Sequence, residues 1–348
     1  MVTRSMAADT LVFVSCADSG ELHVLHLDSG TGQLRTEQIL ALGGQLMPMA
    51  LSPDGTRLYV ARRSDPLAVV TLSVDARAGR SEVVGEAPLP ASMAHVATDG
   101  TGRWLLSASY GANLVAVQAI ADDGAVVAAG DARTYAMGRH AHSALASPCN
   151  GFVLAASLGG GQLHRYRFDA AKGALQPTDP AVFALPTGTG PRHLRFNAQG
   201  DRIYLLGELD ACVHVLAWDE ASGGLQLQQS LPTLPPGFAG PAWGADLHLS
   251  PDGRWLYTSE RNSHTLAGFA VDAATGLLAP MGHWSTQLQP RGFAITPDGR
   301  HLIAAGQISH RVGVHLIAPG SGALTQMAEH DVGLNPNWIT VLPMQPDA

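Results

Sequence analysis

The chain has 348 residues, of which 46% are hydrophobic and 14% are charged, so it has the composition of a folded globular protein rather than a disordered one. Its 21 Lys and Arg stand against 29 Asp and Glu, and the net charge of -8 opposes binding to nucleic acid. No apolar run approaches the roughly 20 residues of a membrane-spanning helix, and the 3 widely spaced cysteines favour a reducing cytoplasm.

Residues 1–10 carry one arginine and lack the apolar stretch of a secretion signal, and we expect this segment to be disordered. A single domain is expected over residues 11–343, because one pattern recurs along that whole length. We expect short strands between turns, since apolar segments such as 22–27 and 213–218 contain β-branched residues and are bounded by turn residues.

The recurring pattern is a turn, Ser/Thr-Pro-Asp-Gly, followed by an apolar pair. It is complete at 52–55, 250–253 and 296–299, and degenerate at 98–100, 147–151 and 197–200. Each copy predicts a tight turn between strands, because Pro presets φ and Gly accepts a positive φ. The strands that follow start about 50 residues apart, a repeat length typical of propeller blades; their aligned residues are Phe13, Tyr59, Leu105, Val153, Tyr204, Tyr257 and Ile303.

The two ends of the chain each supply part of one repeat. The strand expected at 335–340 has no following partner, whereas the strand at 11–15 has no preceding one. We therefore predict that these N- and C-terminal strands pair in one blade, which closes the ring and removes free sheet edges. The predicted fold class is all-β, a seven-bladed β-propeller.

The innermost strand of each blade lines the central channel, so equivalent positions of the repeats are expected to meet near one mouth of it. Five residues before the turns stand Met47, Met93, His142, Arg192, Ala245 and Arg291. Four residues after the aligned positions of the second strands stand Ala17, Arg63, Ser109, Ser157, Glu208, Arg261 and Gln307. His95 lies two residues beyond Met93 on the same strand face, and His193 follows Arg192.

This set favours a functional cluster over solvated charge at strand ends, because Arg, Glu, His and Gln recur at equivalent positions. Guanidinium groups attract an anion and stabilise an oxyanion, while a carboxylate and an imidazole transfer protons. The predicted catalytic residues are His142, Arg192, Glu208 and Arg261. The predicted substrate-binding residues are Arg291, Gln307, Arg63, His95, His193 and Trp338. The expected chemistry is attack of water on an ester-type carbonyl of a substrate that carries a carboxylate or phosphate.

Other chemistries have weaker support in the sequence. Ser143 lacks the context of a nucleophile elbow. His140 and His142 have strand spacing that points both rings one way, but no third ligand lies close in sequence, so we predict no metal and no cofactor. Trp243 and Trp338 could stack on a sugar ring, with packing in the core as the alternative role.

At these residues the chain resembles the seven-bladed lactonase family, which includes propeller-type 6-phosphogluconolactonases and carboxymuconate lactonising enzymes. The resemblance covers about residues 10–342 and rests mainly on the combination of Gly190-Pro191-Arg192-His193 with Gln289-Pro290-Arg291-Gly292-Phe293. The family's active-site His, Arg, Glu and Arg correspond to His142, Arg192, Glu208 and Arg261. The segment 157–161 lacks the acidic residues that are common in the family, and Ala242 stands where an arginine can occur, which favours a changed substrate.

The resemblance implies hydrolysis of an anionic sugar lactone without a metal. Arg192 and Arg261 would hold the anion and polarise the carbonyl, while Glu208 takes a proton from water and His142 protonates the leaving ring oxygen, or with these last two roles exchanged. Arg291 and Gln307 would orient the substrate. Its lactone could be phosphorylated or the non-phosphorylated lactone of an aldaric or uronic acid. A muconate-type lactonising enzyme and a non-catalytic binding scaffold stay open as alternatives, and the sequence carries no signature of an oligomeric interface.

Overall fold

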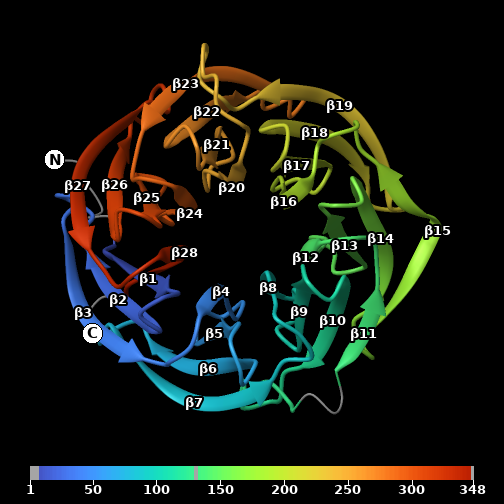
Figure 1. Cartoon of the computed structure of the whole chain (residues 1–348), viewed down its shortest axis with the longest axis horizontal. Coiled ribbons are helices and arrows are strands. Elements are labelled where there is room, and N and C mark those ends of the chain that lie inside the picture. The colour runs from blue at the N-terminus through green and yellow to red at the C-terminus, as the bar shows by residue number, and fades with distance from the viewer. Residues whose placement is uncertain (1–7, 129–131, 346–348) are drawn as a thin grey trace, which may run out of the picture.

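The computed structural model describes residues 8–128 and 132–345, and every helix or strand assigned within them is a β-strand. The strands form seven four-stranded antiparallel sheets around a central channel (Figure 1), which confirms the predicted seven-bladed β-propeller. The expected disordered segment falls mostly on residues 1–7, which lie outside the described residues, and the first strand begins at Thr10. Within the described residues there is no helix long and apolar enough to cross a membrane.

The sheets follow one another around the ring in chain order, each with its innermost strand named first here. The ring-closing sheet contains β28 (Pro336–Pro343), β1 (Thr10–Cys16), β2 (Glu21–Leu27) and β3 (Leu34–Ala41). The next contains β4 (Leu46–Leu51), β5 (Arg57–Arg62), β6 (Ala68–Asp75) and β7 (Arg80–Pro88). The third contains β8 (His95–Thr98), β9 (Trp104–Ser109), β10 (Leu114–Ala119) and β11 (Arg133–Ala136).

The remaining four sheets repeat this order. They contain β12 (Ala141–Ala146), β13 (Phe152–Ser157), β14 (Gln162–Asp169) and β15 (Ala174–Ala184); then β16 (Pro191–Phe196), β17 (Arg202–Gly207), β18 (Cys212–Asp219) and β19 (Gly224–Pro232). The last two contain β20 (Gly244–Leu249), β21 (Trp255–Glu260), β22 (Thr265–Val271) and β23 (Leu278–Ser285); then β24 (Pro290–Ile295), β25 (His301–Gly306), β26 (Arg311–Ile317) and β27 (Leu324–Asp331).

The Ser/Thr-Pro-Asp-Gly turns join the innermost strand of a sheet to the second. In the 52–55 turn, the Asp54 carboxylate accepts the Ser52 hydroxyl at 2.5 Å and the Thr56 amide at 3.0 Å, and Ser52 Oγ accepts the Arg57 amide at 2.9 Å. Gly55 has a φ of 70°, which is costly for other residues. These bonds explain why the motif marks the point where the chain reverses.

The hydrophobic core is divided among the joints between neighbouring sheets. Three of the aligned repeat residues, Tyr59, Tyr204 and Tyr257, reach across a joint, and their hydroxyls donate to glycine carbonyls in the outer hairpin of the next sheet at 3.0, 2.8 and 2.6 Å. Burial raises the pKa of Tyr59 and of Tyr204 to about 12, so these hydroxyls keep their protons and remain donors. Each of these bonds ties one blade to the next.

The ring closes by pairing strands that are far apart in sequence. In the closing sheet β1 runs antiparallel to β28, with Phe13 opposite Thr340 and Val14 opposite Ile339. The prediction that the N- and C-terminal strands share one blade is therefore confirmed. Figure 1 shows β28 at the channel beside β4 and β24, so the closing strand also lines the channel.

Candidate active site

The candidate site lies where the innermost strands begin. Arg192 is the second residue of β16, Glu208 directly follows β17, and Arg261 directly follows β21. Glu208 Oε2 accepts hydrogen bonds from Arg192 Nε at 2.9 Å and from Arg261 Nη2 at 2.8 Å. The side chains of Arg192 and Arg261 are only 1% and 2% exposed, whereas that of Glu208 is 14% exposed. The structure thus brings three of the four predicted catalytic residues into direct contact.

Bulges at the start of the innermost strands allow consecutive residues to reach the channel. The register between β16 and β17 shifts between Pro191 and His193, and the register between β20 and β21 shifts between Gly244 and Leu247. A regular strand would send successive side chains to opposite faces, and a bulge re-aims one of them. His193 can therefore contact the guanidinium of its neighbour Arg192, with a separation of 3.3 Å between Arg192 Nη1 and His193 Nε2.

The backbone around Glu208 is packed too closely for side chains. A Cβ on Gly207 would lie 2.7 Å from the Thr189 carbonyl, and a Cβ on Gly244 would lie 2.5 Å from the Gly207 carbonyl. The Glu208 amide donates to the Gly190 carbonyl at 2.8 Å. Glycines at these positions let three loops from two sheets approach one another, which fixes the height of Glu208 between the arginines.

Arg261 is held by backbone and aromatic contacts. Its Nε donates to the Trp243 carbonyl at 3.2 Å, its Nη2 donates to the Gly244 carbonyl at 2.9 Å, and its guanidinium lies 4.0 Å from the centre of the Trp243 ring. Burial and the nearby Arg192 lower the pKa of Arg261 to about 9, although Glu208 opposes the shift. The Trp243 ring therefore supports a buried arginine through a cation–π contact.

Positive charge exceeds negative charge at this end of the channel. Burial, followed by Arg192, Arg261 and Arg63, holds the pKa of Arg291 well below its usual range. Arg291 Nε is buried without a hydrogen-bond partner in the described part of the chain, and Arg63 donates only to neutral atoms, Ser92 Oγ at 3.0 Å and Met47 Sδ at 2.8 Å. Glu208 is ion-paired with two of these four guanidinium groups, and the remaining positive charge favours a bound anion.

Gln307, predicted to bind substrate, follows β25 and donates from Nε2 to Asn335 Oδ1 at 2.7 Å. This bond links it to the loop before β28, beside the closing strand. Its amide oxygen is not occupied by that bond and can still accept from a hydroxyl group.

His142 lies on β12, is 4% exposed, and its Nδ1 has no hydrogen-bond partner among the described residues. Its ring packs edge to face against that of His193, with centroids 5.2 Å apart. The pKa of His142 lies well below 6.5, mainly because the ring is buried and secondly because the positive charge of Arg192 is close. His142 is therefore neutral at pH 7 and can accept a proton.

Glu208 is held as a carboxylate by its two arginine partners. Burial raises the pKa of Glu208, but Arg192 and Arg261 together outweigh burial and leave it below 4.5. Glu208 Oε2 already accepts two charged hydrogen bonds. Its carboxylate is therefore better placed to order the two arginines than to take a proton from water.

Asp246 is a buried carboxylate that the sequence reasoning missed. Its Oδ1 lies 2.8 Å from His193 Nδ1 and its Oδ2 lies 3.1 Å from His248 Nε2. Burial raises the pKa of Asp246, but His248 and His193 outweigh it and hold that pKa well below 3.8. Asp246 follows Ala245 as His193 follows Arg192, so extending the repeat alignment by one residue would have found it.

The predicted residues His95, His193 and Trp338 meet one layer deeper. Ring centroids are 5.5 Å apart for His95 and His193, 5.5 Å for His193 and Trp338, and 5.8 Å for His95 and Trp338. Burial and then Arg195 lower the pKa of His95 to about 3. These rings form the floor beneath the arginine cluster, and Trp338 packs against histidines at this depth.

Metal binding by His140 and His142 was the other possibility raised by the sequence. His140, the suggested partner of His142 in metal binding, has a φ of 58° and stacks on Tyr110 with ring centroids 4.1 Å apart. Residues 8–128 and 132–345 contain no group of three or more His, Cys, Asp or Glu that could hold a metal ion.

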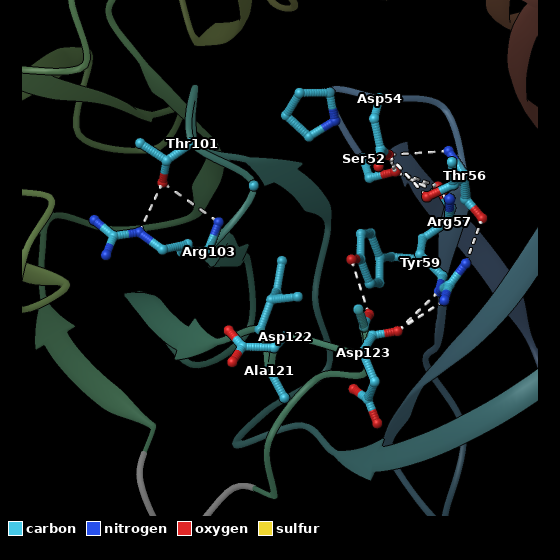
Figure 2. Close-up of a pocket in the computed structure, with 14 residues that line it drawn as sticks. Ser52, Asp54, Thr56, Arg57, Tyr59, Thr101, Arg103, Ala121, Asp122 and Asp123 are labelled. Carbon is cyan, nitrogen blue, oxygen red and sulfur yellow. Dashed lines mark hydrogen bonds between the residues drawn. The ribbon is translucent and has the colours of Figure 1, made fainter.

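A separate cavity of about 330 Å³ lies at the joint between the sheets of β4 and β8 (Figure 2), and no candidate residue lines it. There Arg57 Nη2 donates to the Asp123 carbonyl at 2.8 Å and Tyr59 donates to Gly124, so the polar groups tie two blades together. This cavity belongs to the joint and not to the arginine cluster.

Fold and site together define a seven-bladed propeller with an anion-attracting Arg/Glu/His cluster at one end of its channel. Residues 10–341 match the family described as "Lactonase, 7-bladed beta-propeller", and the chain belongs to this family. It is similar to the 6-phosphogluconolactonase of Serratia proteamaculans (strain 568), with 38% identity over 288 residues, 82% of this chain and 84% of that protein. The 6-phosphogluconolactonase of Sodalis glossinidius (strain morsitans) is 36% identical over 285 residues, 82% of this chain and 84% of that protein.

Among solved structures, the chain is similar to the periplasmic gluconolactonase of Pseudomonas aeruginosa. The TM-score is 0.90 and the sequence identity is 28%, over 97% of this chain and all of that one (100%). The family predicted from the sequence motifs is therefore confirmed.

Proposed function

We propose that this chain hydrolyses the lactone of an anionic sugar acid and that 6-phosphogluconolactone is its substrate. The observation that carries the proposal is the cluster of four buried or half-buried arginines near Glu208, whose excess positive charge matches a phosphorylated sugar lactone. Relatives named 6-phosphogluconolactonase, at 35% to 38% identity, support the same substrate.

In the proposed mechanism Arg192 and Arg261 polarise the lactone carbonyl and stabilise the oxyanion that forms when water attacks it. Glu208 keeps both guanidinium groups aimed at that position. Each donor to an oxyanion is worth roughly 3 to 4 kcal/mol in known enzymes. Arg291, Arg63 and Gln307 bind the phosphate and the hydroxyl groups.

We assign both proton transfers to His142, whereas the sequence led us to expect Glu208 and His142 to share them. His142 takes the proton of the attacking water and returns it to the ring oxygen as the carbon–oxygen bond breaks, so no proton is gained or lost by the site. Substrate binding supports this role. Burial depresses the pKa of His142 most, and nearby arginines depress it further; a bound anion partly neutralises these arginines, so the pKa of His142 rises when the substrate is present.

The experiment that tests the substrate is acid release from freshly made lactones, followed with a pH indicator. The panel contains 6-phosphogluconolactone, gluconolactone, glucarolactone and galactarolactone. We expect kcat/KM to be roughly 100-fold higher for the phosphorylated lactone, a difference of about 2.7 kcal/mol. A preference for gluconolactone or an aldarolactone would overturn the phosphate assignment but keep lactone hydrolysis. No acceleration with any lactone would overturn both.

We place the reaction in the cytoplasm and expect a small molecule, and not nucleic acid, as the partner. Cys16, Cys149 and Cys212 are all free, and Cys149 is exposed, which suits a reducing compartment. Because the similar gluconolactonase of Pseudomonas aeruginosa is described as periplasmic, the compartment has to be tested. Fractionation of cells that produce the native chain is expected to recover activity with cytoplasmic markers, and recovery in a periplasmic extract would contradict the assignment.

A further inference from the structure

The far end of the channel contains a second cavity of about 390 Å³. All seven innermost strands line it, and most of its lining residues come from their later halves, so it lies on the axis of the ring. Arg195 of β16 lines it, three residues after Arg192. A strand rises about 3.3 Å per residue, so the two arginines lie roughly 10 Å apart along the channel. The cavity therefore opens away from the candidate active site.

The polar groups of this far cavity have unused hydrogen-bonding capacity. Arg195 is partly buried and makes no ion pair with a carboxylate within the described residues; its Nη1 donates to the adjacent Leu194 carbonyl at 3.0 Å, and its Nη2 lies 3.5 Å from His248 Nε2. His95 also lines the cavity, is 3% exposed, and has a buried Nδ1 that lacks a partner in the structure described. A buried polar atom without a partner costs free energy that a ligand can recover.

The aromatic floor of the active site separates the two ends. His193 packs on His95 and Trp338, and both of these line the far cavity. A molecule in the far cavity thus faces the opposite side of this floor from Arg192 and Glu208. It cannot be substrate held by the arginine cluster.

The rest of the lining decides what kind of anion fits. Apart from Arg195, the histidines and two threonines, the walls are mainly apolar, and include Met49, Val96, Leu145, Ile295 and Ile339. One guanidinium matches one carboxylate, whereas the buried Asp246 behind His248 opposes further negative charge. A cavity of this size, with apolar walls and few polar groups, is typical of sites for small ligands.

We propose that this far cavity is a second ligand site, which binds a small monocarboxylate with an aromatic or branched apolar body. Its carboxylate pairs with Arg195, and its apolar body lies against Trp338 and the aliphatic walls. The proposal does not depend on the identity of the lactone.

Isothermal titration calorimetry with benzoate tests the site, with benzamide as the neutral probe of equal shape. We expect benzoate to bind the wild-type protein and benzamide to bind at least about ten-fold more weakly, because a charged hydrogen bond is lost. Arg195→Gln is expected to weaken benzoate binding by about ten-fold or more. Arg300→Gln is the matched control, because Arg300 is exposed and follows a turn on the same face.

Thr340→Leu is a second variant, which narrows the cavity without removing a charge, and it too is expected to weaken benzoate binding. Thermal unfolding of each variant shows whether it is folded. Absence of benzoate binding to the wild type would overturn the proposal. The proposal would also be overturned if Arg195→Gln and Thr340→Leu both bound benzoate as tightly as the wild type does. The anion would then be bound by the arginine cluster at the other end of the channel. Lactone hydrolysis by the wild-type protein is measured separately, so failure of this proposal is distinguishable from failure of the proposed function.

Discussion

Replacing His142 with asparagine is expected to lower kcat by about 10²- to 10⁴-fold, the usual contribution of a positioned general base. This corresponds to about 2.7 to 5.5 kcal/mol of activation free energy. Asparagine keeps a polar group at the position but cannot take up a proton at neutral pH. KM is expected to change little, because Arg192, Arg261 and Arg291 bind the anion. The assay is acid release from 6-phosphogluconolactone, corrected for spontaneous hydrolysis.

The pH dependence provides a second measurement of the same role. Because the pKa of free His142 lies well below 6.5, wild-type kcat/KM is expected to be flat from about pH 6.5 to 8 and to fall only in more acidic solution, as the base becomes protonated. His330→Asn is the control, since this histidine lies on the outer strand β27. The reasoning is refuted if His142→Asn keeps more than half of the wild-type kcat, or if the acid limb has its midpoint above pH 7.

Four further outcomes are expected. Glu208→Gln should lower kcat/KM by about 100-fold, since two charged hydrogen bonds order the arginines, and a change below threefold would contradict that role. Arg291→Met should raise KM for the phosphorylated lactone while stabilising the free protein by about 1 kcal/mol or more, measured by urea unfolding, because a buried group without a partner is removed; an unchanged KM would count against anion binding. The pKa of His95 is about 3 in the folded protein, so below about pH 6.5 the unfolded chain binds more protons than the folded one. The free energy of unfolding should therefore be unaffected by His95 above that pH and about 2 kcal/mol lower at pH 5, measured by urea unfolding. His95→Gln should make this loss of stability at acidic pH smaller. Tyr257→Phe should cost about 1 kcal/mol, through loss of its bond to Gly322, with Tyr166→Phe as the comparison.

The fold could be predicted because its signals are local. Each Ser/Thr-Pro-Asp-Gly motif closes a turn through its own side chains, as Ser52 and Asp54 do, and the repeat length then fixes the number of blades. Contact between Glu208 and the two arginines was also predictable, because equivalent residues of the repeats lie at the same height in the ring.

The parts of the site that were missed depend on bulges, burial and the assembly of the whole ring. A bulge at the start of β20 lets Asp246 lie beside the channel directly after Ala245, as the bulge in β16 does for His193, and our alignment followed only one residue of each innermost strand. Whether Glu208 or His142 transfers the proton depends on burial and on the neighbouring charges, and these are set only when the chain has folded. The far cavity was missed because residues of all seven innermost strands line it, and it exists only when the whole ring has assembled.

The pairing of β28 with β1 also sets the order in which the protein can become active during synthesis. A ribosome makes β1 first and β28 only after the six intervening sheets, so the nascent chain holds an unpaired edge at β1 until the last strand emerges. Trp338, on β28, is part of both the floor of the active site and the wall of the far cavity. Neither site can therefore be complete on a ribosome-bound fragment that lacks this strand, and the chain gains its binding sites in one step when the ring closes.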